Sequence, residues 1–310
     1  MKDNTIATAG DQEYFWGILM LIASMRRNGM DEPVLVGERG FAPWQRAALE
    51  RIPDVALRSL DGSGQSLTCA KPEVMLQADT EYVTWVDGDG FFIGNCSELL
   101  IPRDDRQIHI RRRSPEENPL AFRHFSYGED GRAIPQAILD AWREDVGSGI
   151  PPRLRQSCSA CLLSVHRSAR NFLRHWRDQM AAVLPAGNVG VVDRRLKFYH
   201  QLDESVLNSL LCFAPEAPEP SPEYRLDRAP SRLFVHFIGQ PKPWQGWTPR
   251  AIRFFHEYAA GADYAIRQGW INAGQLPAPL DPSRYAVCRL TAPLVSIRTK
   301  IRNRLRRLWS

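Results

Sequence analysis

Residues 82–93 of the chain read YVTWVDGDGFFI, and this stretch decides the fold class. The apolar and β-branched residues 82–86 predict a buried strand, and two carboxylates follow it with one residue between them. In open α/β sheets, ligands bind beyond the carboxyl ends of the strands. Because alternate residues of an extended chain point to one side, we expect Asp87 and Asp89 to face one cation. Two carboxylate oxygens suit Mn²⁺ or Mg²⁺.

The same stretch has two other interpretations. Asp-Gly is a strong hairpin signal, so residues 87–90 could simply form a tight turn between two paired strands. A calcium loop is the second alternative, because Glu98 is the twelfth residue counted from Asp87. However, Phe91 and Phe92 occupy the positions where such a loop needs a ligand and a glycine.

Strand and helix patterns alternate outward from this stretch. In the N-terminal half we expect strands at 5–9, 33–37, 55–57 and 82–86, and helices at 14–27, 43–51 and 71–78. This alternation predicts βαβ units and a mainly parallel sheet. In the second half we expect strands at 107–110, 161–165 and 233–237, helices at 133–145, 169–183 and 204–212, and a Pro-rich loop at 215–230.

A second polar cluster follows the predicted strand 233–237. A lone His at a strand end is more often structural, but His236 can also supply a metal ligand through a neutral ring nitrogen. Gly239 lets the backbone approach a ligand, and Lys242 is a point charge suited to phosphate. Neither of the two common glycine-rich phosphate-loop motifs is present.

At these two clusters the sequence resembles the retaining glycosyltransferases of family 8, which include glycogenin and bacterial lipopolysaccharide galactosyltransferases. The D-x-D motif matches Asp87-Gly88-Asp89, and H-x-x-G-x-x-K-P-W matches residues 236–244 at every fixed position. The resemblance implies an α/β fold of the GT-A type, a Rossmann-like mixed sheet flanked by helices. It also implies transfer of a sugar from a UDP-sugar to a hydroxyl, with Mn²⁺ or Mg²⁺ held by Asp87, Asp89 and His236.

Three weaker matches, at residues 9–14, 159–163 and 203–208, lie in the family's order. Each departs from a residue common in the family: Glu13 for Asn, Ser159 for Asn, Cys161 for Gly, and Glu204 for Gln. These departures leave the identity of the sugar and the stereochemistry open. They also leave open a non-catalytic module that only binds carbohydrate or a membrane partner.

The resemblance assigns roles to residues along the whole chain. The expected nucleotide-sugar-binding residues are Asp11, Glu13, Tyr14, Lys71, Asp87, Gly88, Ser159, Gly239 and Lys242. Asp203 is expected to bind sugar hydroxyls, and Glu204 to act either as a nucleophile or as a stabiliser of an oxocarbenium-like centre. The simpler interpretation of Glu204 is a carboxylate favoured by the start of a helix.

A nucleotidyltransferase is a further alternative, because it shares the α/β layout. Such an enzyme would be expected to have a glycine-rich loop bearing Arg or Lys after the first strand. Here residues 9–13 read AGDQE, which is acidic, so the glycosyltransferase interpretation is favoured.

The net charge of +5 belongs to the C-terminus. Lys and Arg number 40 against 35 Asp and Glu, and six of the basic residues lie between 298 and 307, with no acid over 296–310. Without these six, 34 basic and 35 acidic residues give −1. Apolar residues recur here at helical spacing: Leu294, Ile297, Ile301, Leu305 and Leu308. A basic amphipathic helix ending in Trp309 is typical of interfacial membrane binding. The alternative is a helix docked on its own protein, and nucleic-acid binding is not expected.

We expect three segments: a GT-A-like domain over 1–262 with an acceptor-side insertion at about 103–149, an extended Pro-rich connection over 263–292, and a basic tail over 293–310. The apolar run 15–23 is too short to span a bilayer, and acids precede it, so a signal peptide is not expected. Six sparse Cys are expected to be buried thiols. We expect a cytoplasmic protein, peripheral on the inner face of the membrane, that glycosylates a saccharide, glycolipid or protein in bacterial surface-glycan or lipopolysaccharide synthesis.

Overall fold

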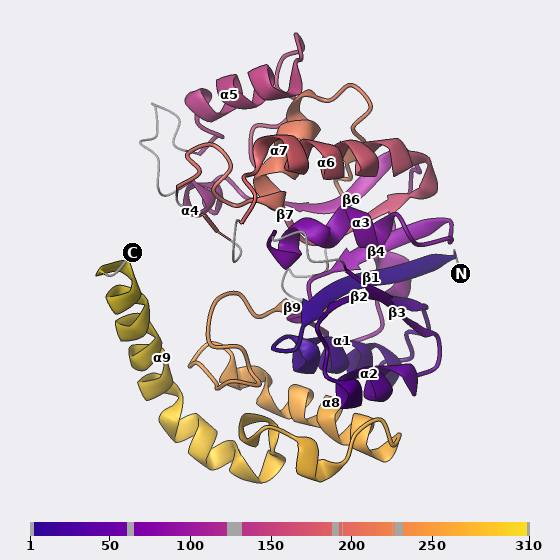
Figure 1. The fold of residues 1–310 in the computed structure, drawn as a ribbon, viewed down its shortest axis with the longest axis vertical. Coiled ribbons are helices and arrows are strands. Elements are labelled where there is room, and N and C mark those ends of the chain that lie inside the picture. The colour runs from indigo at the N-terminus through magenta and orange to yellow at the C-terminus, as the bar shows by residue number, and fades with distance from the viewer. Residues whose placement is uncertain are drawn as a thin grey trace.

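The structure is a computed structural model that describes residues 3–60, 65–122, 132–187, 192–193, 195–224, 226 and 232–308. In these residues, seven strands form one mixed sheet in the order β3-β2-β1-β4-β7-β6-β8 (Figure 1). The strands are β1 (Asn4–Asp11), β2 (Val34–Arg39), β3 (Val55–Ser59), β4 (Tyr82–Val86), β6 (Gln107–Arg112), β7 (Cys158–His166) and β8 (Glu219–Pro220). Strands β1 to β4 are parallel to one another, whereas β7 runs antiparallel to both β4 and β6. The predicted α/β class with a mixed sheet is therefore confirmed.

Helices cover both faces of this sheet (Figure 1). One apolar core packs around α1 (Phe15–Arg27), α2 (Pro43–Glu50) and α8 (Phe255–Arg267). The other packs around α3 (Lys71–Met75), α5 (Gln136–Val146), α6 (Arg170–Val183) and α7 (Asp203–Phe213); the short α4 spans Asn118–Ala121. Burial of the central strands on both faces explains their nearly continuous apolar sequences.

The Asp-Gly turn after β4 does not form a hairpin. It leads into β5 (Gly90–Phe92), which pairs antiparallel with β9 (Phe234–His236) and not with β4. The hairpin interpretation is therefore wrong, because the partner of β5 comes from far along the chain. Phe91 and Phe92 are buried strand residues, which also argues against a calcium loop.

Two of the expected segments differ in detail from the structure. Within the predicted insertion at 103–149, β6 lies inside the central sheet, between β7 and β8. The predicted extended connection over 263–292 contains the end of α8, three short 3₁₀ turns and the start of α9 (Tyr285–Leu308). Pro279 is the second residue of one of these turns and Pro282 is the first residue of another, and proline is tolerated in such a first turn.

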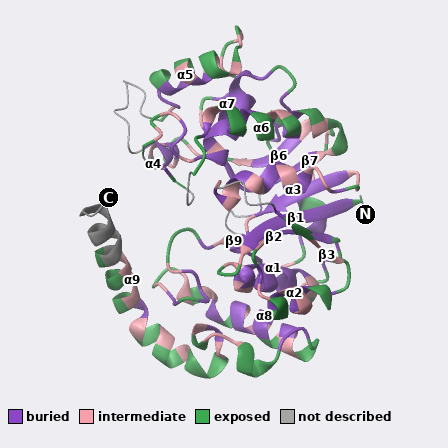
Figure 2. Cartoon of the chain, viewed as in Figure 1, coloured by how far each residue is buried: buried purple, intermediate pink, exposed green. Residues whose placement is uncertain are grey.

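Helix α9 extends from the body of the molecule as a curved arm (Figure 1). Its inner face packs on the body through Ala292, which is 1% exposed, and through Val295, which lies beside Gly246. Large apolar side chains on its outer face are exposed (Figure 2): Val287, Leu290, Leu294, Ile297 and Ile301, hereafter the α9 stripe. The predicted stripe residues Leu305 and Leu308, and Trp309, lie outside the side chains that the structure describes.

Among the described residues, no helix has both the length and the apolar character needed to span a membrane. All six cysteines are free thiols, and all but Cys288 are buried.

Candidate active site

A cavity of about 560 Å³ opens beyond the carboxyl ends of β1 and β4. Most of the predicted site residues line it, although they come from distant parts of the chain: Asp11, Tyr14, Lys71, Asp87, Gly88, Asp89, Ser159, Asp203, Glu204, His236, Gly239 and Lys242. Glu13 does not line the cavity. Its contribution here is through the backbone, since its carbonyl accepts a hydrogen bond of 2.8 Å from Trp244 Nε1.

Asp87, Asp89 and His236 form a group of possible metal ligands whose ligand atoms lie within 4.8 Å of one another. His236 Nε2 lies 3.0 Å from Asp89 Oδ1 and 3.6 Å from Asp87 Oδ2. The pairing of Gly90 with His236 in the β5–β9 ribbon brings the imidazole to the two carboxylates. Two carboxylates and one imidazole form a donor set that suits Mn²⁺ or Mg²⁺.

Lys242 also contacts this group, through Asp89. Its ammonium contacts Asp89 Oδ2 and donates a hydrogen bond of 2.9 Å to the Phe237 carbonyl. Both side chains are about 95% buried. Burial alone would raise the pKa of Asp89, but the neighbouring His236 and Lys242 hold it below its ordinary value. Lys242 therefore neutralises one predicted metal ligand in this state of the protein.

Lys71, at the start of α3, links Asp87 to Asp203 across the cavity. Its Nζ atom lies 2.8 Å from Asp87 Oδ1 and 3.0 Å from Asp203 Oδ2, and donates to the Ala160 carbonyl at 3.0 Å. Burial disfavours the charged amine, but Asp203 and Asp87 raise the pKa of Lys71 above its ordinary value. Burial raises the pKa of Asp203 to about 6, although Lys71 opposes this shift.

Glu204 lies beside this network with both carboxylate oxygens engaged. Arg113 Nη2 lies 2.6 Å from Oε1, and the Ala160 amide donates to Oε2 at 2.9 Å. Arg113 also lines the cavity. Sequence reasoning gave Arg113 no role; its only sequence signal is its place after the strand 107–112.

The loop after β1 contributes Asp11 and Tyr14 to the lining of the cavity. Asp11 Oδ1 accepts hydrogen bonds from the amides of Glu13 and Tyr14, which fixes the turn after β1. The Tyr14 ring packs edge-on against Trp244, with 5.7 Å between ring centroids. Burial, followed by the nearby carboxylates Asp89 and Asp87, raises the pKa of Tyr14, so its hydroxyl stays protonated.

No protein-family model matches the sequence, and no curated protein matches it either. The structure, however, is similar to solved glycosyltransferases. Similar structures include the bifunctional glycosyltransferase WbbM (TM-score 0.54, 14% identity, 87% of this chain and 50% of that one) and GlyE of Streptococcus pneumoniae TIGR4 (0.54, 16%, 87% and 63%). A third is the galactosyltransferase LgtC in complex with donor and acceptor sugar analogues (0.50, 14%, 87% and 96%). The chain has the GT-A glycosyltransferase fold. It spans about half the length of WbbM.

One close contact that the sequence did not predict joins Gly17, in α1, to the turn that contains Gly88. A Cβ atom on Gly17, in α1, would lie 2.1 Å from the Gly88 carbonyl oxygen and 2.5 Å from the Trp244 ring. The α1 helix thus packs directly under the Asp87–Asp89 turn, and only glycine permits this approach. Inside an apolar helix sequence, such a glycine carries little signal of its own.

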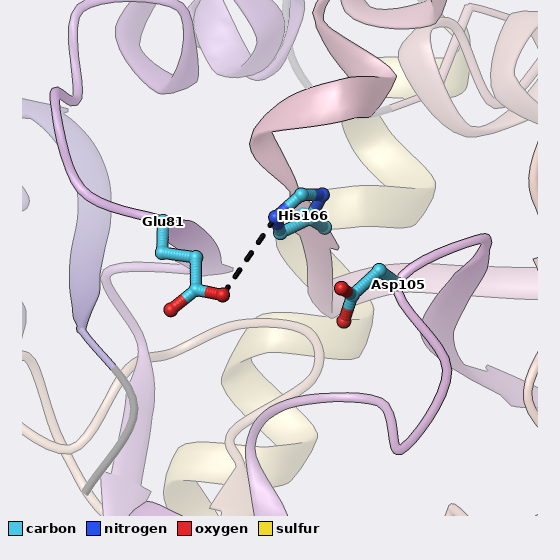
Figure 3. A group of neighbouring side chains, drawn as sticks. All are labelled: Glu81, Asp105 and His166. Atoms are coloured by element: carbon cyan, nitrogen blue, oxygen red, sulfur yellow. Dashed lines mark ion pairs between the residues drawn. The ribbon is translucent and has the colours of Figure 1, made fainter.

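The GT-A sheet carries a second group of possible ligands at the opposite end of β4: Glu81, Asp105 and His166 (Figure 3). Glu81 Oε1 lies 3.8 Å from His166 Nε2. The His166 Nδ1 atom accepts from the Ser168 amide at 3.2 Å, which leaves the ring proton of neutral imidazole on Nε2. Asp105 accepts from the Tyr82 hydroxyl. These hydrogen bonds explain the group without a metal ion.

Proposed function

We propose that the protein is a glycosyltransferase that moves a sugar from a nucleoside diphosphate sugar, a UDP-sugar, to a hydroxyl acceptor with retention. The observation that carries this proposal is the meeting of Asp87, Asp89 and His236 beside Lys242 in one cavity. Its position in a GT-A fold supports the assignment, since LgtC was solved with donor and acceptor sugar analogues.

Asp87, Asp89 and His236 would hold Mn²⁺ or Mg²⁺, which when bound neutralises charge that develops on the leaving diphosphate. Lys242 has a flexible side chain beside this site, and we propose that it moves from Asp89 to a diphosphate oxygen when the donor binds. Gly88 and Gly239 leave room for the donor next to the backbone.

The two ends of the donor have separate contacts. Asp11 and Tyr14 would hold the nucleoside, by hydrogen bonding and by stacking. At the other end, Asp203 and Ser159 would bind sugar hydroxyls, and Glu204 would stabilise positive charge on the sugar. Asp203 is fixed by Lys71 and Glu204 by Arg113, so both carboxylates are preorganised before the donor arrives.

The proposed transfer breaks the bond between the anomeric carbon and the diphosphate oxygen, and the electron pair leaves with the nucleoside diphosphate. A new bond forms between the anomeric carbon and the acceptor oxygen on the same face of the ring. The proton of the acceptor hydroxyl is released to solvent. The products are a glycoside, a nucleoside diphosphate and one proton.

We further propose that α9 binds an anionic membrane surface, which would place the enzyme at the inner face of the membrane with a saccharide, glycolipid or protein acceptor in surface-glycan or lipopolysaccharide synthesis. The α9 stripe is exposed, and residues 285–310 contain no Asp or Glu. Exposed apolar residues with basic neighbours fit an anionic lipid surface, whereas two such helices from two copies would repel each other.

The test of the proposed enzyme combines binding and turnover. We expect UDP to raise the melting temperature only with Mn²⁺, and Asp89→Ala to abolish this shift while the exposed Asp79→Ala keeps it. A panel of UDP-sugars should include one that releases UDP and free sugar slowly with Mn²⁺. Binding of saccharide without any nucleotide response would favour the non-catalytic module instead. Pyrophosphate release from a nucleoside triphosphate and a sugar phosphate would favour the nucleotidyltransferase.

A further inference from the structure

Strand β7 carries a bulge where Ser159 and Cys161 line the cavity. In the β6–β7 pairing, Ile110 lies opposite Leu163, but the next residue, Arg111, lies opposite Ser159. Residues 160–162 are therefore extra on the β7 side. Ala160 lies in the bulge and has no pairing partner in β6, so its amide N–H and its carbonyl need other hydrogen-bond partners.

Two charged side chains supply those partners. The Ala160 amide donates to Glu204 Oε2 at 2.9 Å, and the Ala160 carbonyl accepts from Lys71 Nζ at 3.0 Å. The backbone of the single residue Ala160 thus joins Glu204 to Lys71, which in turn contacts Asp87 and Asp203. A shift of Glu204 would be transmitted to the charged groups around the donor site.

Arg113 holds Glu204 from the other side. Its Nη2 atom lies 2.6 Å from Glu204 Oε1, and its Nη1 atom donates to Ser157 Oγ and to the Cys158 carbonyl, both at 2.9 Å. The two charged side chains are only 13% and 14% exposed. The guanidinium therefore donates two hydrogen bonds to residues at the start of β7, and its third contact is with the Glu204 carboxylate.

This arrangement limits what Glu204 can do. A nucleophile must present an oxygen lone pair to the anomeric carbon, and each oxygen of Glu204 already accepts a hydrogen bond that lowers its nucleophilicity. A glycosyl ester at either oxygen would also neutralise the carboxylate and leave the poorly exposed cation of Arg113 without its counter-charge, which is unfavourable. An ester at Oε2 would weaken the hydrogen bond from the Ala160 amide as well.

We propose that Arg113 is a positioning residue for the sugar subsite. It holds Glu204 in a fixed position in which the carboxylate stabilises positive charge on the donor sugar and forms no covalent bond to it. This inference rests on the proposed glycosyltransferase function and deepens it, because it decides between the two roles open to Glu204. Arg suits the task better than Lys, since its planar fork reaches acceptors in several directions at once.

The test uses the full chain with Mn²⁺ and the UDP-sugar that the wild type hydrolyses fastest. We expect Arg113→Met to lower kcat about 10- to 100-fold, the usual effect of losing such a supporting contact. The KM for the donor and the UDP–Mn²⁺ melting shift should change little. Arg113→Lys should keep part of the activity, which separates positioning from a failure to fold. The matched control is Arg112→Met, because exposed Arg112 only donates to the Pro220 carbonyl.

Two further measurements test the route through Glu204. The double variant Arg113→Met with Glu204→Gln should be no slower than Glu204→Gln alone, because Arg113 acts through Glu204. Intact-protein mass spectrometry of wild type quenched during turnover should show no glycosyl adduct on Glu204.

Several results would overturn the inference. These are additive losses in the double variant, a glycosyl adduct on wild-type Glu204, or equal kcat for Arg113→Met and Arg112→Met. Failure of the proposed function looks different: the wild type would hydrolyse no donor and show no UDP–Mn²⁺ shift, and the inference would then be overturned with it.

Discussion

The Nζ atom of Lys71 lies 2.8 Å from Oδ1 of Asp87, and both residues line the cavity. The same ammonium contacts Asp203, so one buried cation balances two carboxylates of different proposed function. We expect Lys71→Met to destabilise the protein by about 3–5 kcal/mol, because it leaves buried carboxylates without their counter-charge. Urea unfolding measures this loss. Exposed Lys197→Met is the control, and equal stability of the two variants would contradict the bridging role.

In the proposed metal site, Lys242 and the metal ion would compete for Asp89, so we expect Lys242→Met to have two opposite effects. The affinity for Mn²⁺ alone should rise, because the cation that contacts Asp89 is gone. The affinity for UDP in the presence of Mn²⁺ should fall about 10- to 100-fold, since a charged hydrogen bond contributes about 1.5–3 kcal/mol. Calorimetric titration of Mn²⁺, and then of UDP, measures both. A fall in both affinities would mean that Lys242 does not compete with the metal.

Gly17→Ala should displace the turn that carries Asp87 and Asp89, the residues of the proposed metal site. The added methyl group would overlap the Gly88 carbonyl, so we expect the Asp87–Asp89 turn to shift. The UDP–Mn²⁺ melting shift should then be lost even at temperatures where circular dichroism shows a folded protein. Gly274→Ala is the matched control, because a Cβ there would meet no atom within 4 Å. An unchanged ligand response in Gly17→Ala would show that the turn tolerates this displacement.

Asp203 should make stability depend on pH. Burial raises its pKa from 3.8 to about 6 in the folded protein. For a group whose folded pKa is raised, the stabilising contribution is complete below the unfolded pKa and is lost as the pH rises through the folded pKa. The shift of about two units corresponds to about 3 kcal/mol. Between pH 4 and pH 7, wild type should therefore lose about 3 kcal/mol relative to Asp203→Asn. Urea unfolding in EDTA across this range tests the prediction, and parallel curves would refute it.

The α9 stripe should control membrane binding. On a helix of about 100° per residue its five residues fall within about 80° of one another, on the side opposite Ala292. Replacing Leu294, Ile297 and Ile301 by Gln should weaken binding to anionic vesicles at least about tenfold, because each buried apolar side chain contributes about 1.5–3 kcal/mol when fully buried. Ser296→Gln is the control. Co-sedimentation with anionic and neutral vesicles, together with a 1–292 truncation, measures the effect. Unchanged binding in the triple variant would exclude the stripe as the anchor.

The sequence predicts that Asp87, Asp89 and His236 lie close together, and the structure places them so. Asp87 and Asp89 come directly after β4, so a local pattern puts them at the carboxyl edge of the central sheet, whereas His236 ends β9 of the separate β5–β9 ribbon. The pairing of β5 with β9 is not local, which is why the hairpin remained open until the structure excluded it.

Other features depend on contacts that no local pattern encodes. Arg113 meets Glu204 across 91 residues of sequence, and the bulge that lets Glu204 and Lys71 reach Ala160 has no sequence signature of its own. The position of β6 inside the sheet was missed for a related reason. A short strand with few apolar residues can belong either to an insertion or to the edge of a sheet, and only its neighbours decide.

The β5–β9 ribbon has a consequence for how the protein is made. Asp87 and Asp89 leave the ribosome long before His236, which pairs through β9 with Gly90. During synthesis, the N-terminal half can form its parallel strand pairs while the imidazole ligand is still untranslated. A nascent chain can therefore bring these three side chains together only after residue 236 has been translated. Cation capture at this centre would then be a late event, and a chain interrupted before residue 236 would lack it.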